Sequence, residues 1–296
     1  MGALCGLFGK SRQAFYQHNG SYFQEKAAEQ IILEEVKNIR AQAPRMGCLK
    51  LHFKIKEKFA DLEIMGRDSF FDFLRTNGYA LRKRKTRKTT NSKHHYHKFG
   101  NLIRGFKPTG PNQLWVSDIA YIDTEDGTCY LSIITDAYSH KIVRWIQGET
   151  LEAKYPIQAL EEALRGLTSI ERLQLIHHSD RGVQYCCHKY VDILQENNIA
   201  ISMTENGDPL ENAIAERING ILKSEWLYHT RLKNLDDANE QMRTIIEFYN
   251  QERPHLSIDM LTSDQAHLME GELKQCWRNY YSQESTQASF SFQSQR

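Results

Sequence analysis

One carboxylate lies inside the most strand-like stretch of the chain, between Leu114 and Ile122. The stretch is rich in β-branched and aromatic residues, and in a strand Asp118 would share one face with Val116, Ala120 and Ile122. A carboxylate on an apolar strand face is costly unless a cation meets it. The position of Asp118 therefore indicates a cation-binding site on a buried strand.

From Pro111 onward the sequence has the pattern of an α/β domain. Three strand-type runs separated by short turn signals predict a meander, and helices then alternate with strands. The predicted elements are strands 114–122, 129–135 and 141–146, helix 156–167, a strand that includes 173–176 and ends at Asp180, a helix through Tyr190, a strand at 199–203, the helix of Glu216, and a last helix over 238–249.

Two further carboxylates stand where α/β proteins commonly keep reactive groups. Asp180 precedes Gly182 and marks the point at which a strand gives way to a loop. Glu216 belongs to a helix expected to start with Asp208 as its N-cap and Glu211 in a capping box. The polar side of that helix is predicted to carry Asn212, Glu216, Asn219 and Lys223. Glu216 is therefore expected to point away from the core; a solvated helix face is the alternative interpretation.

The three carboxylates stand in short motifs that follow one another along the chain, with 35 residues between Asp180 and Glu216. The motifs are Trp115–Ile122, His178–Tyr185, Ser202–Thr204 with Gly207, Asn212–Glu216 leading to Leu222–Glu225, and Tyr249–Asn250 with Arg253–His255. Together they resemble the bacterial insertion-sequence transposases, whose OrfB-type catalytic subunit carries a retroviral-integrase-like DDE core. The resemblance implies an α/β, ribonuclease-H-like integrase catalytic core at 109–270. Before it we expect a small all-α, helix-turn-helix-like DNA-binding region at 1–80 and a basic linker at 81–108, and after it a partly disordered tail at 271–296.

The donor atoms predict the metal. Carboxylate oxygens without thiolates favour Mg²⁺ or Mn²⁺ over zinc, and three carboxylates on neighbouring elements can hold two such ions. The resemblance implies that Asp118 bridges both ions, that Asp180 binds one and that Glu216 binds the other. It also implies a phosphoryl transfer, in which water nicks DNA at a 3′ end or a DNA 3′-hydroxyl attacks in strand transfer. Without metal, the three carboxylates should raise one another's pKa.

Charge is unevenly distributed, although the formal net charge is only +1. Residues 1–107 hold 22 Lys and Arg against 9 Asp and Glu, about +13, which leaves about −12 for the rest. The basic run in this part predicts contact with DNA phosphates, and a solvated linker is the alternative. The predicted contacts in the run are Arg82, Lys83, Arg84, Lys85, Arg87 and Lys88.

Side chains near the carboxylates form a second group of predicted DNA contacts: His178, Arg181, Asn212, Asn219, Lys223 and Arg253. Lys223 lies about two turns after Glu216 on the same helix face, which suits a phosphate contact. Arg253 has two open interpretations, a phosphate contact or a link that locks the last helix. His178 is interpreted as a support for the site or a DNA contact rather than as a base, because adjacent strand residues point apart.

The first 80 residues are predicted to be helical. Residues 3–18 should form a short hairpin of the helix-turn-helix kind, with Ser11 capping its second helix. Further helices are expected at about 24–40, 44–59 and 67–76. We expect this front part to contact DNA, although small helical bundles often serve only as packing.

Other features limit the class of protein. No apolar run approaches the roughly 20 residues of a membrane span, and the first residues lack the pattern of a signal peptide. The six cysteines form no C-x-x-C pair, which disfavours a zinc site at His94, His95, His97 or 186–188 and favours a reducing compartment. We therefore expect a bacterial cytoplasmic protein that is nucleoid-associated when bound to DNA.

The expected partners follow from the resemblance. They are double-stranded DNA, as the element's terminal repeats and as the target, further copies of the chain on DNA, and the product of an upstream reading frame. Two alternatives remain open: a catalytically silent DNA-binding protein derived from a transposase, and a ribonuclease-H-type nuclease. The presence of all three carboxylates disfavours the first, and the helical basic front disfavours the second.

Overall fold

The computed structural model describes residues 12–60, 64–81, 95–205, 212–274 and 276, and over 12–25 only the path of the backbone. The predicted basic contacts at 82–88, the predicted helix cap at Asp208 and Glu211, and the first residues of the predicted hairpin lie outside these ranges.

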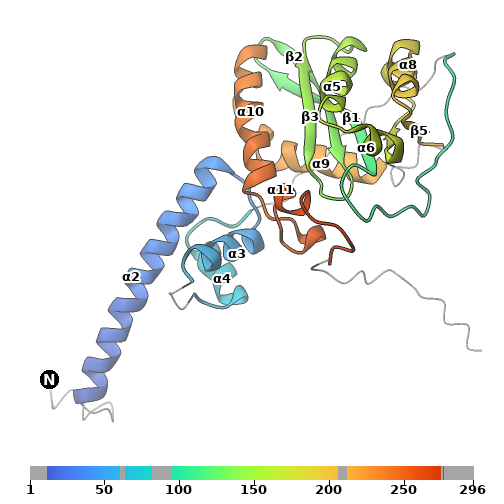
Figure 1. Ribbon diagram of the computed structural model, residues 1–296. Helices are drawn as coiled ribbons and strands as arrows, with labels where there is room; N and C mark the ends of the chain where they lie inside the picture. Colours follow the sequence, from blue (N-terminus) through green and yellow to red (C-terminus); the bar gives the residue numbers. More distant parts are fainter. Residues whose placement is uncertain (1–11, 61–63, 82–94, 206–211, 275, 277–296) are drawn as a thin grey trace, which may run out of the picture.

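The centre of the fold is a mixed five-stranded sheet in the order β3-β2-β1-β4-β5 (Figure 1). The strands are β1 (Leu114–Thr124), β2 (Gly127–Asp136), β3 (Ile142–Gly148), β4 (Ile176–Ser179) and β5 (Ala200–Met203). The first three form an antiparallel meander, as predicted, and β4 and β5 run parallel to β1. With helices on both faces, this is the ribonuclease-H-like integrase core that the sequence predicts.

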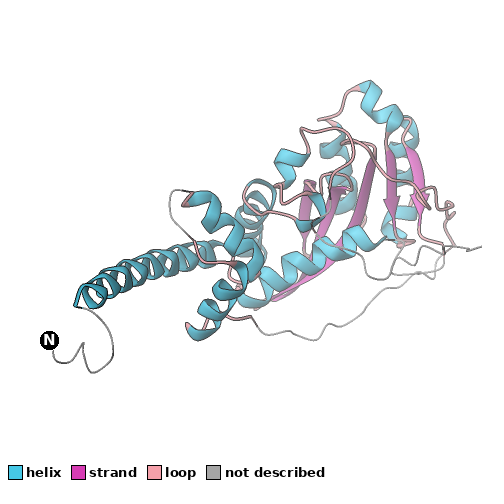
Figure 2. Cartoon of the chain, turned by 90° about the horizontal axis from the view of Figure 1, so that it is seen from below, coloured by secondary structure: helices cyan, strands magenta, loops and turns pink. Residues whose placement is uncertain are grey.

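Helices cover both faces of the sheet (Figure 2). One core cluster joins Trp115 of β1 to α5 (Lys154–Leu164) and α8 (His188–Glu196). Another joins Ala120 and Ile122 of β1 to α9 (Ala213–Glu225) and α10 (Leu235–Gln251). Short helices complete the described part: α6 (Ser169–Gln174), α7 (Val183–Cys186), η2 (Leu227–His229), η3 (Leu256–Ile258) and α11 (Ser263–Ala266).

The strand before Asp180 is shorter than predicted, because Leu173 lies in α6 rather than in a strand. Thr168 and Glu171 form a capping box, and these reciprocal hydrogen bonds start a helix where the apolar run predicts a strand. Leu173 is 67% exposed, so its hydrophobicity carries no information about the sheet. The strand begins at Ile176.

Within the described residues of the front, the helices are α2 (Arg12–Gln42), α3 (Cys48–Lys58) and α4 (Arg67–Thr76). The two later helices agree with the prediction, but the predicted break after residue 18 is wrong: α2 is continuous and extends away from the rest of the chain (Figure 1). The predicted elements leave residues 19–23 between them, which include Gly20, but a glycine inside a helix costs only about 1 kcal/mol relative to alanine. A helix as long as α2 can absorb that cost.

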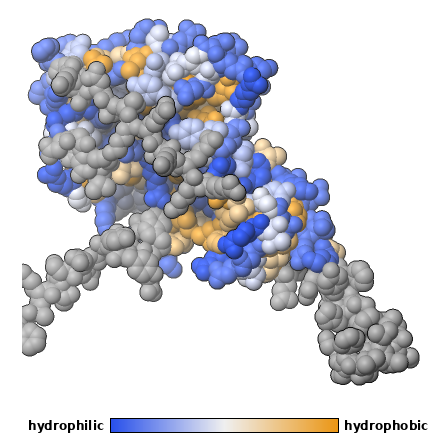
Figure 3. Space-filling model, turned by 180° about the vertical axis from the view of Figure 1, so that it is seen from behind, coloured by the Kyte–Doolittle hydropathy of each residue, from blue (hydrophilic) through white to orange (hydrophobic). Residues whose placement is uncertain are grey.

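The helical front shares a hydrophobic core with the C-terminal half of α9 and with α10. Met46, Leu51 and Ile55 belong to the same buried cluster as Trp226 and Phe248. The Trp226 indole also donates a hydrogen bond of 2.8 Å to the Gln42 carbonyl. On the face seen in Figure 3, the described residues are largely hydrophilic, with separate apolar patches. The domain limits at 80 and 108 stay predictions.

The described part of the predicted linker covers the outer edge of β5. Met203 donates its N–H to the Gly100 carbonyl, and Leu102 donates its N–H to the Ser202 hydroxyl. An uncovered edge strand would present unpaired backbone groups. This segment therefore closes the sheet on the side of β4 and β5.

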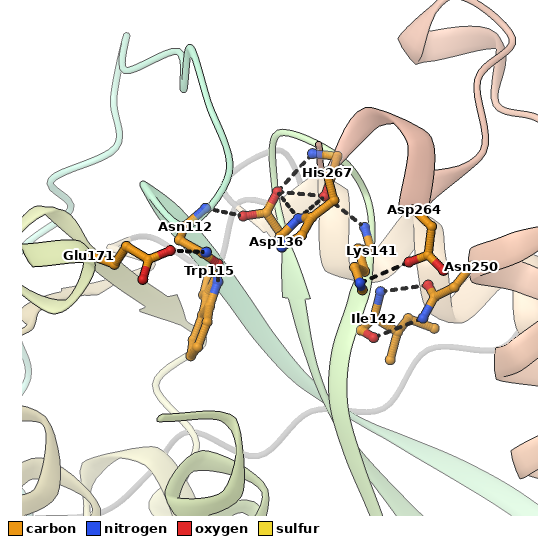
Figure 4. Close-up of polar contacts among 10 residues, drawn as sticks. Asn112, Trp115, Asp136, Lys141, Ile142, Glu171, Asn250, Asp264 and His267 are labelled. Atoms are coloured by element: carbon orange, nitrogen blue, oxygen red, sulfur yellow. Dashed lines mark hydrogen bonds and ion pairs between the residues drawn. The ribbon is translucent and has the colours of Figure 1, made fainter. Parts of the chain in front are cut away.

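A polar network holds the N-terminal end of β1 against the β2–β3 turn (Figure 4). The buried Asp136 carboxylate accepts hydrogen bonds from the backbone N–H groups of Asn112 and Ser139, each 2.8 Å long. Asn250 of α10 donates to and accepts from the backbone of Ile142, like one more strand residue, at 3.0 Å each way. The Tyr249–Asn250 motif therefore attaches α10 to β3.

Candidate active site

The sheet register brings Asp118 and Asp180 together. Strands β1 and β4 are parallel, and their pairing ends with Ser117 opposite Ser179. The two aspartates are the next residue on each strand, and β4 ends at this point. Asp118 is half-buried on the face of β1 that α9 covers. Carboxyl ends of parallel strands are the usual location of reactive groups in α/β sheets.

Helix α9 docks on this part of β1 through two asparagines. Asn212 donates to the Ser117 carbonyl at 3.4 Å, and Asn219 donates to Asp118 Oδ2 at 2.6 Å. Glu216 lies about one turn from each asparagine and is exposed, as the sequence predicts. The helix thus presents the third carboxylate on the side that faces Asp118.

The pKa of Asp118 reflects its burial and the charged and polar groups around it. Burial raises the pKa of Asp118 to about 7, with further increases from the negative charges of Asp180 and Glu216. Hydrogen bonds from the Ile119 N–H and the Asn219 amide act in the opposite direction. Asp118 is therefore coupled to both other carboxylates, and a cation would relieve the repulsion.

The three carboxylates do not form a closed cage. Among the residues that the structure describes, no three His, Cys, Asp or Glu side chains are gathered closely enough to hold a metal ion. Glu216 is exposed on its helix and is the side chain with room to move toward the two aspartates. The set nevertheless has the chemistry of a magnesium site, because all of its donors are hard carboxylate oxygens.

The raised pKa of Asp118 predicts a pH-dependent stability for the metal-free protein. The carboxyl keeps its proton up to about pH 7 in the folded chain but ionises near its ordinary pKa of about 4 in the unfolded chain. The folded state binds more protons over this interval, so the free energy of unfolding should fall as the pH rises from about 4 to about 7. Thermal unfolding in EDTA measures this decline. If Asp118→Asn left the decline unchanged, another group would be its cause.

Asp180 is held by the loop that follows β4. The Gly182 N–H donates to Asp180 Oδ1 at 2.9 Å, and a Cβ on Gly182 would lie only 2.9 Å from the same oxygen. Gly182→Ala should therefore displace the carboxylate and lower the rate of DNA cleavage about tenfold to a hundredfold, since small misplacements of reacting groups are costly. A cleavage assay checks this, with Gly166→Ala as the control, because a Cβ there meets no contact below 3.5 Å. Equal rates in both variants would contradict the role of Gly182.

Lys223 and Arg181 flank the carboxylates. Lys223 is half-buried on α9, and burial lowers its pKa while the charges of Asp118 and Asp123 act against this decrease. Arg181 donates to the Glu205 carbonyl at 2.7 Å and is also half-buried. Both cations lie beside the site, and contact with DNA stays a prediction for each.

Four of the predicted DNA contacts are buried in protein instead. His178 is fully buried, with its Nδ1 2.8 Å from the Ser202 hydroxyl. Arg253 is 2% exposed and donates twice to Glu225, which is the locking role that was the second interpretation. Asn212 and Asn219 are each 7% exposed and bind β1. Their burial does not fit direct contact with DNA, because short polar side chains and a paired arginine fill interior positions here.

Two features of the site were not predicted from the sequence. The first is the role of Asn219 as the hydrogen-bond partner of Asp118; its position three residues after Glu216 is the signal that could have indicated it. The second is a buried network below the site, in which His177 Nε2 lies 2.8 Å from the Ser117 hydroxyl and 2.9 Å from the Tyr190 hydroxyl. This network links β1, β4 and α8 directly behind the two aspartates.

The mixed sheet, the paired aspartates at its strand ends and the glutamate on the covering helix define the class: a DDE-type polynucleotidyl transferase with an integrase core. Two models of the family described as "Integrase core domain" match residues 108–209 and 197–262. The chain is 38% identical over 259 residues to an uncharacterized 31 kDa protein of insertion element IS600 from Shigella sonnei, covering 85% of this chain and 93% of that one. The chain belongs to the insertion-sequence transposases.

Other relatives match over a smaller share of this chain and of their own length. The transposase for IS629 from Shigella sonnei is 33% identical over 58% of this chain and 57% of its own length. The transposase for IS904 from Lactococcus lactis is 33% identical over 56% of this chain and 68% of its own. Among solved structures, the HTLV-2 integrase catalytic core domain in complex with magnesium is 18% identical, with a TM-score of 0.42, covering 54% of this chain and 99% of that one.

None of the described helices combines the length and the apolar character that a membrane crossing requires.

Proposed function

We propose that this transposase cuts and joins DNA at the ends of an insertion sequence, with Asp118, Asp180 and Glu216 holding two divalent ions, Mg²⁺ or Mn²⁺. The observation that carries the proposal is the coupling of Asp118 to both other carboxylates at the end of β4. Bound there, such ions would supply the positive charge that stabilises the attacking and leaving oxygens at phosphorus.

The roles of the protein groups follow from their positions. The family resemblance implies that Asp118 would contact both ions, Asp180 one and Glu216 the other, and the electrostatic coupling of Asp118 to both other carboxylates supports this assignment. Asn219 orients Asp118 through the 2.6 Å hydrogen bond to Oδ2, while Oδ1 accepts from the Ile119 N–H. Each carboxylate oxygen can accept more than one bond, so both could still contact a cation. Lys223 would bind a phosphate of the DNA beside the reacting one.

The reaction exchanges one P–O bond for another. When water attacks, the bond to the 3′ oxygen breaks and the element's end is released with a free 3′-hydroxyl. When that hydroxyl attacks a target phosphodiester, the new P–O bond joins the element to the target, and the target strand leaves with its own 3′-hydroxyl. Both steps use the same three carboxylates.

Purified protein, labelled terminal-repeat duplex and Mg²⁺ test the proposal. We expect nicked ends and joined products with Mg²⁺ or Mn²⁺ and none in EDTA. Binding without cleavage would instead indicate a silent DNA-binding protein, and cleavage of an RNA–DNA hybrid alone would indicate a ribonuclease-H-type nuclease. The assay should be run with and without the product of the upstream reading frame.

We also propose that the chain acts in the bacterial cytoplasm as an oligomer on DNA. The excess of basic residues in 1–107 supports contact with the duplex. Two element ends must be joined to one target, which requires more than one active site in the assembly. Size-exclusion chromatography with light scattering, with and without terminal DNA, measures the stoichiometry.

A further inference from the structure

A cavity of about 1060 Å³ lies between the helical front, the catalytic core and the segment that follows α10. Its wall includes Ile214, Arg217 and Ile221 of α9, which lie on a different side of that helix from Glu216. The basic residues of the wall outnumber the acidic ones: Lys50, Lys107, Arg217, Arg253 and Lys274 against Glu272. The cavity is therefore separate from the candidate active site and carries a positive potential.

The inner wall contains a buried cluster with more positive than negative charge. Glu225 accepts hydrogen bonds from Lys50 at 3.1 Å and from Arg253 at 2.7 and 2.9 Å, so two cations share one carboxylate. Burial lowers the pKa of Lys50 to about 8, and the adjacent Arg253 contributes to this decrease. A buried excess charge is costly unless an ion of the opposite sign lies near it.

The histidines of the wall do not add to this charge. Burial lowers the pKa of His140 to about 4 and that of His255 well below its ordinary value, and the cations nearby lower both further. Both rings are therefore neutral at pH 7. The positive potential comes from the lysines and arginines, and the two lysines at the rim, Lys107 and Lys274, are exposed.

We infer that this cavity binds a backbone phosphate of DNA outside the active site. Lys107 and Lys274 would donate to the phosphate oxygens, and the Lys50–Glu225–Arg253 cluster would supply the net positive charge behind them. The inference rests on the proposed function in that DNA is the substrate. Because α9 carries both Glu216 and one wall of the cavity, DNA held here is held beside the helix of the third carboxylate.

The test is the salt dependence of duplex binding, measured in EDTA so that it needs no catalysis. For the double variant Lys107→Gln/Lys274→Gln we expect weaker binding and a slope of log affinity against log salt that is smaller by about 1, the value for one lost phosphate contact. The matched control is Lys189→Gln/Lys233→Gln, which removes two exposed lysines elsewhere. Both pairs of positions are exposed, so folding should be preserved. A slope that changes no more in the first variant than in the control would overturn the inference.

Experiments with inorganic phosphate distinguish the two possible anions in the cavity, a DNA phosphodiester and free phosphate. If the cavity takes a DNA phosphodiester, phosphate at matched ionic strength should displace the duplex no better than chloride. Binding of inorganic phosphate to the free protein that is lost in the rim variant, together with an unchanged slope for duplex binding, would assign the cavity to free phosphate and overturn the assignment to DNA. The proposed function can fail separately. If the unchanged protein does not cleave DNA with Mg²⁺, but the rim variant still shows the expected decrease in salt slope, the proposed function is contradicted and this inference stands.

Discussion

Asp118→Asn should abolish both end cleavage and strand transfer, with a loss of about a thousandfold or more. The substitution removes the carboxylate that couples to both others, and a bound metal contributes several kcal/mol of transition-state charge stabilisation. Single-turnover assays with labelled terminal duplex measure the effect. Glu216→Gln should lose activity to a similar extent.

The same change should not unfold the protein. Replacing the Asp118 carboxylate by an amide would remove a like-charge repulsion, so the melting temperature in EDTA at neutral pH should stay the same or rise. Asp192→Asn, on the exposed side of α8, is the matched control and should keep full activity. An Asp118→Asn protein that still joins ends, or an inactive one that is also unfolded, would contradict the assignment.

Glu225→Gln should have the largest effect on stability, a loss of about 3–5 kcal/mol in the free energy of unfolding. The carboxylate is buried and pairs with Arg253 and Lys50, so the amide would leave two buried cations without their counter-ion. The cluster also joins the helical front to α9. Urea unfolding at pH 7 measures the change.

The control for this prediction is an exposed ion pair. Asp72 and Arg75 form such a pair on α4, with both side chains at least 70% exposed. Asp72→Asn should change stability by less than about 1 kcal/mol. If Glu225→Gln cost no more than Asp72→Asn, the buried cluster would not hold the helical front to the core.

The order of the core elements could be predicted because local patterns determine them. Strand β1 follows from its β-branched residues, and α10 follows from the spacing of Ala238, Met242 and Ile245, which are all buried. The third carboxylate was predicted on the exposed side of its helix, and Glu216 is exposed. Its role as a ligand stays a prediction.

The failures have a common physical origin, because tertiary contacts decide them. Leu173 is apolar but lies in a capped helix with no core beside it. For Arg253 the sequence leaves two interpretations open, and its partner Glu225, 28 residues away, gives it the locking role. Asn219 gains its role only when α9 docks on β1. No pattern along the chain shows which distant residue a polar side chain will meet.

The most direct test of the account is a crystal structure of the protein with terminal-repeat DNA and Mn²⁺, examined by anomalous scattering at the manganese edge. We expect two manganese peaks bounded by the carboxylates of Asp118, Asp180 and Glu216, with the scissile phosphate between them. Manganese bound elsewhere, or a Glu216 carboxylate turned away from both aspartates in that complex, would contradict it.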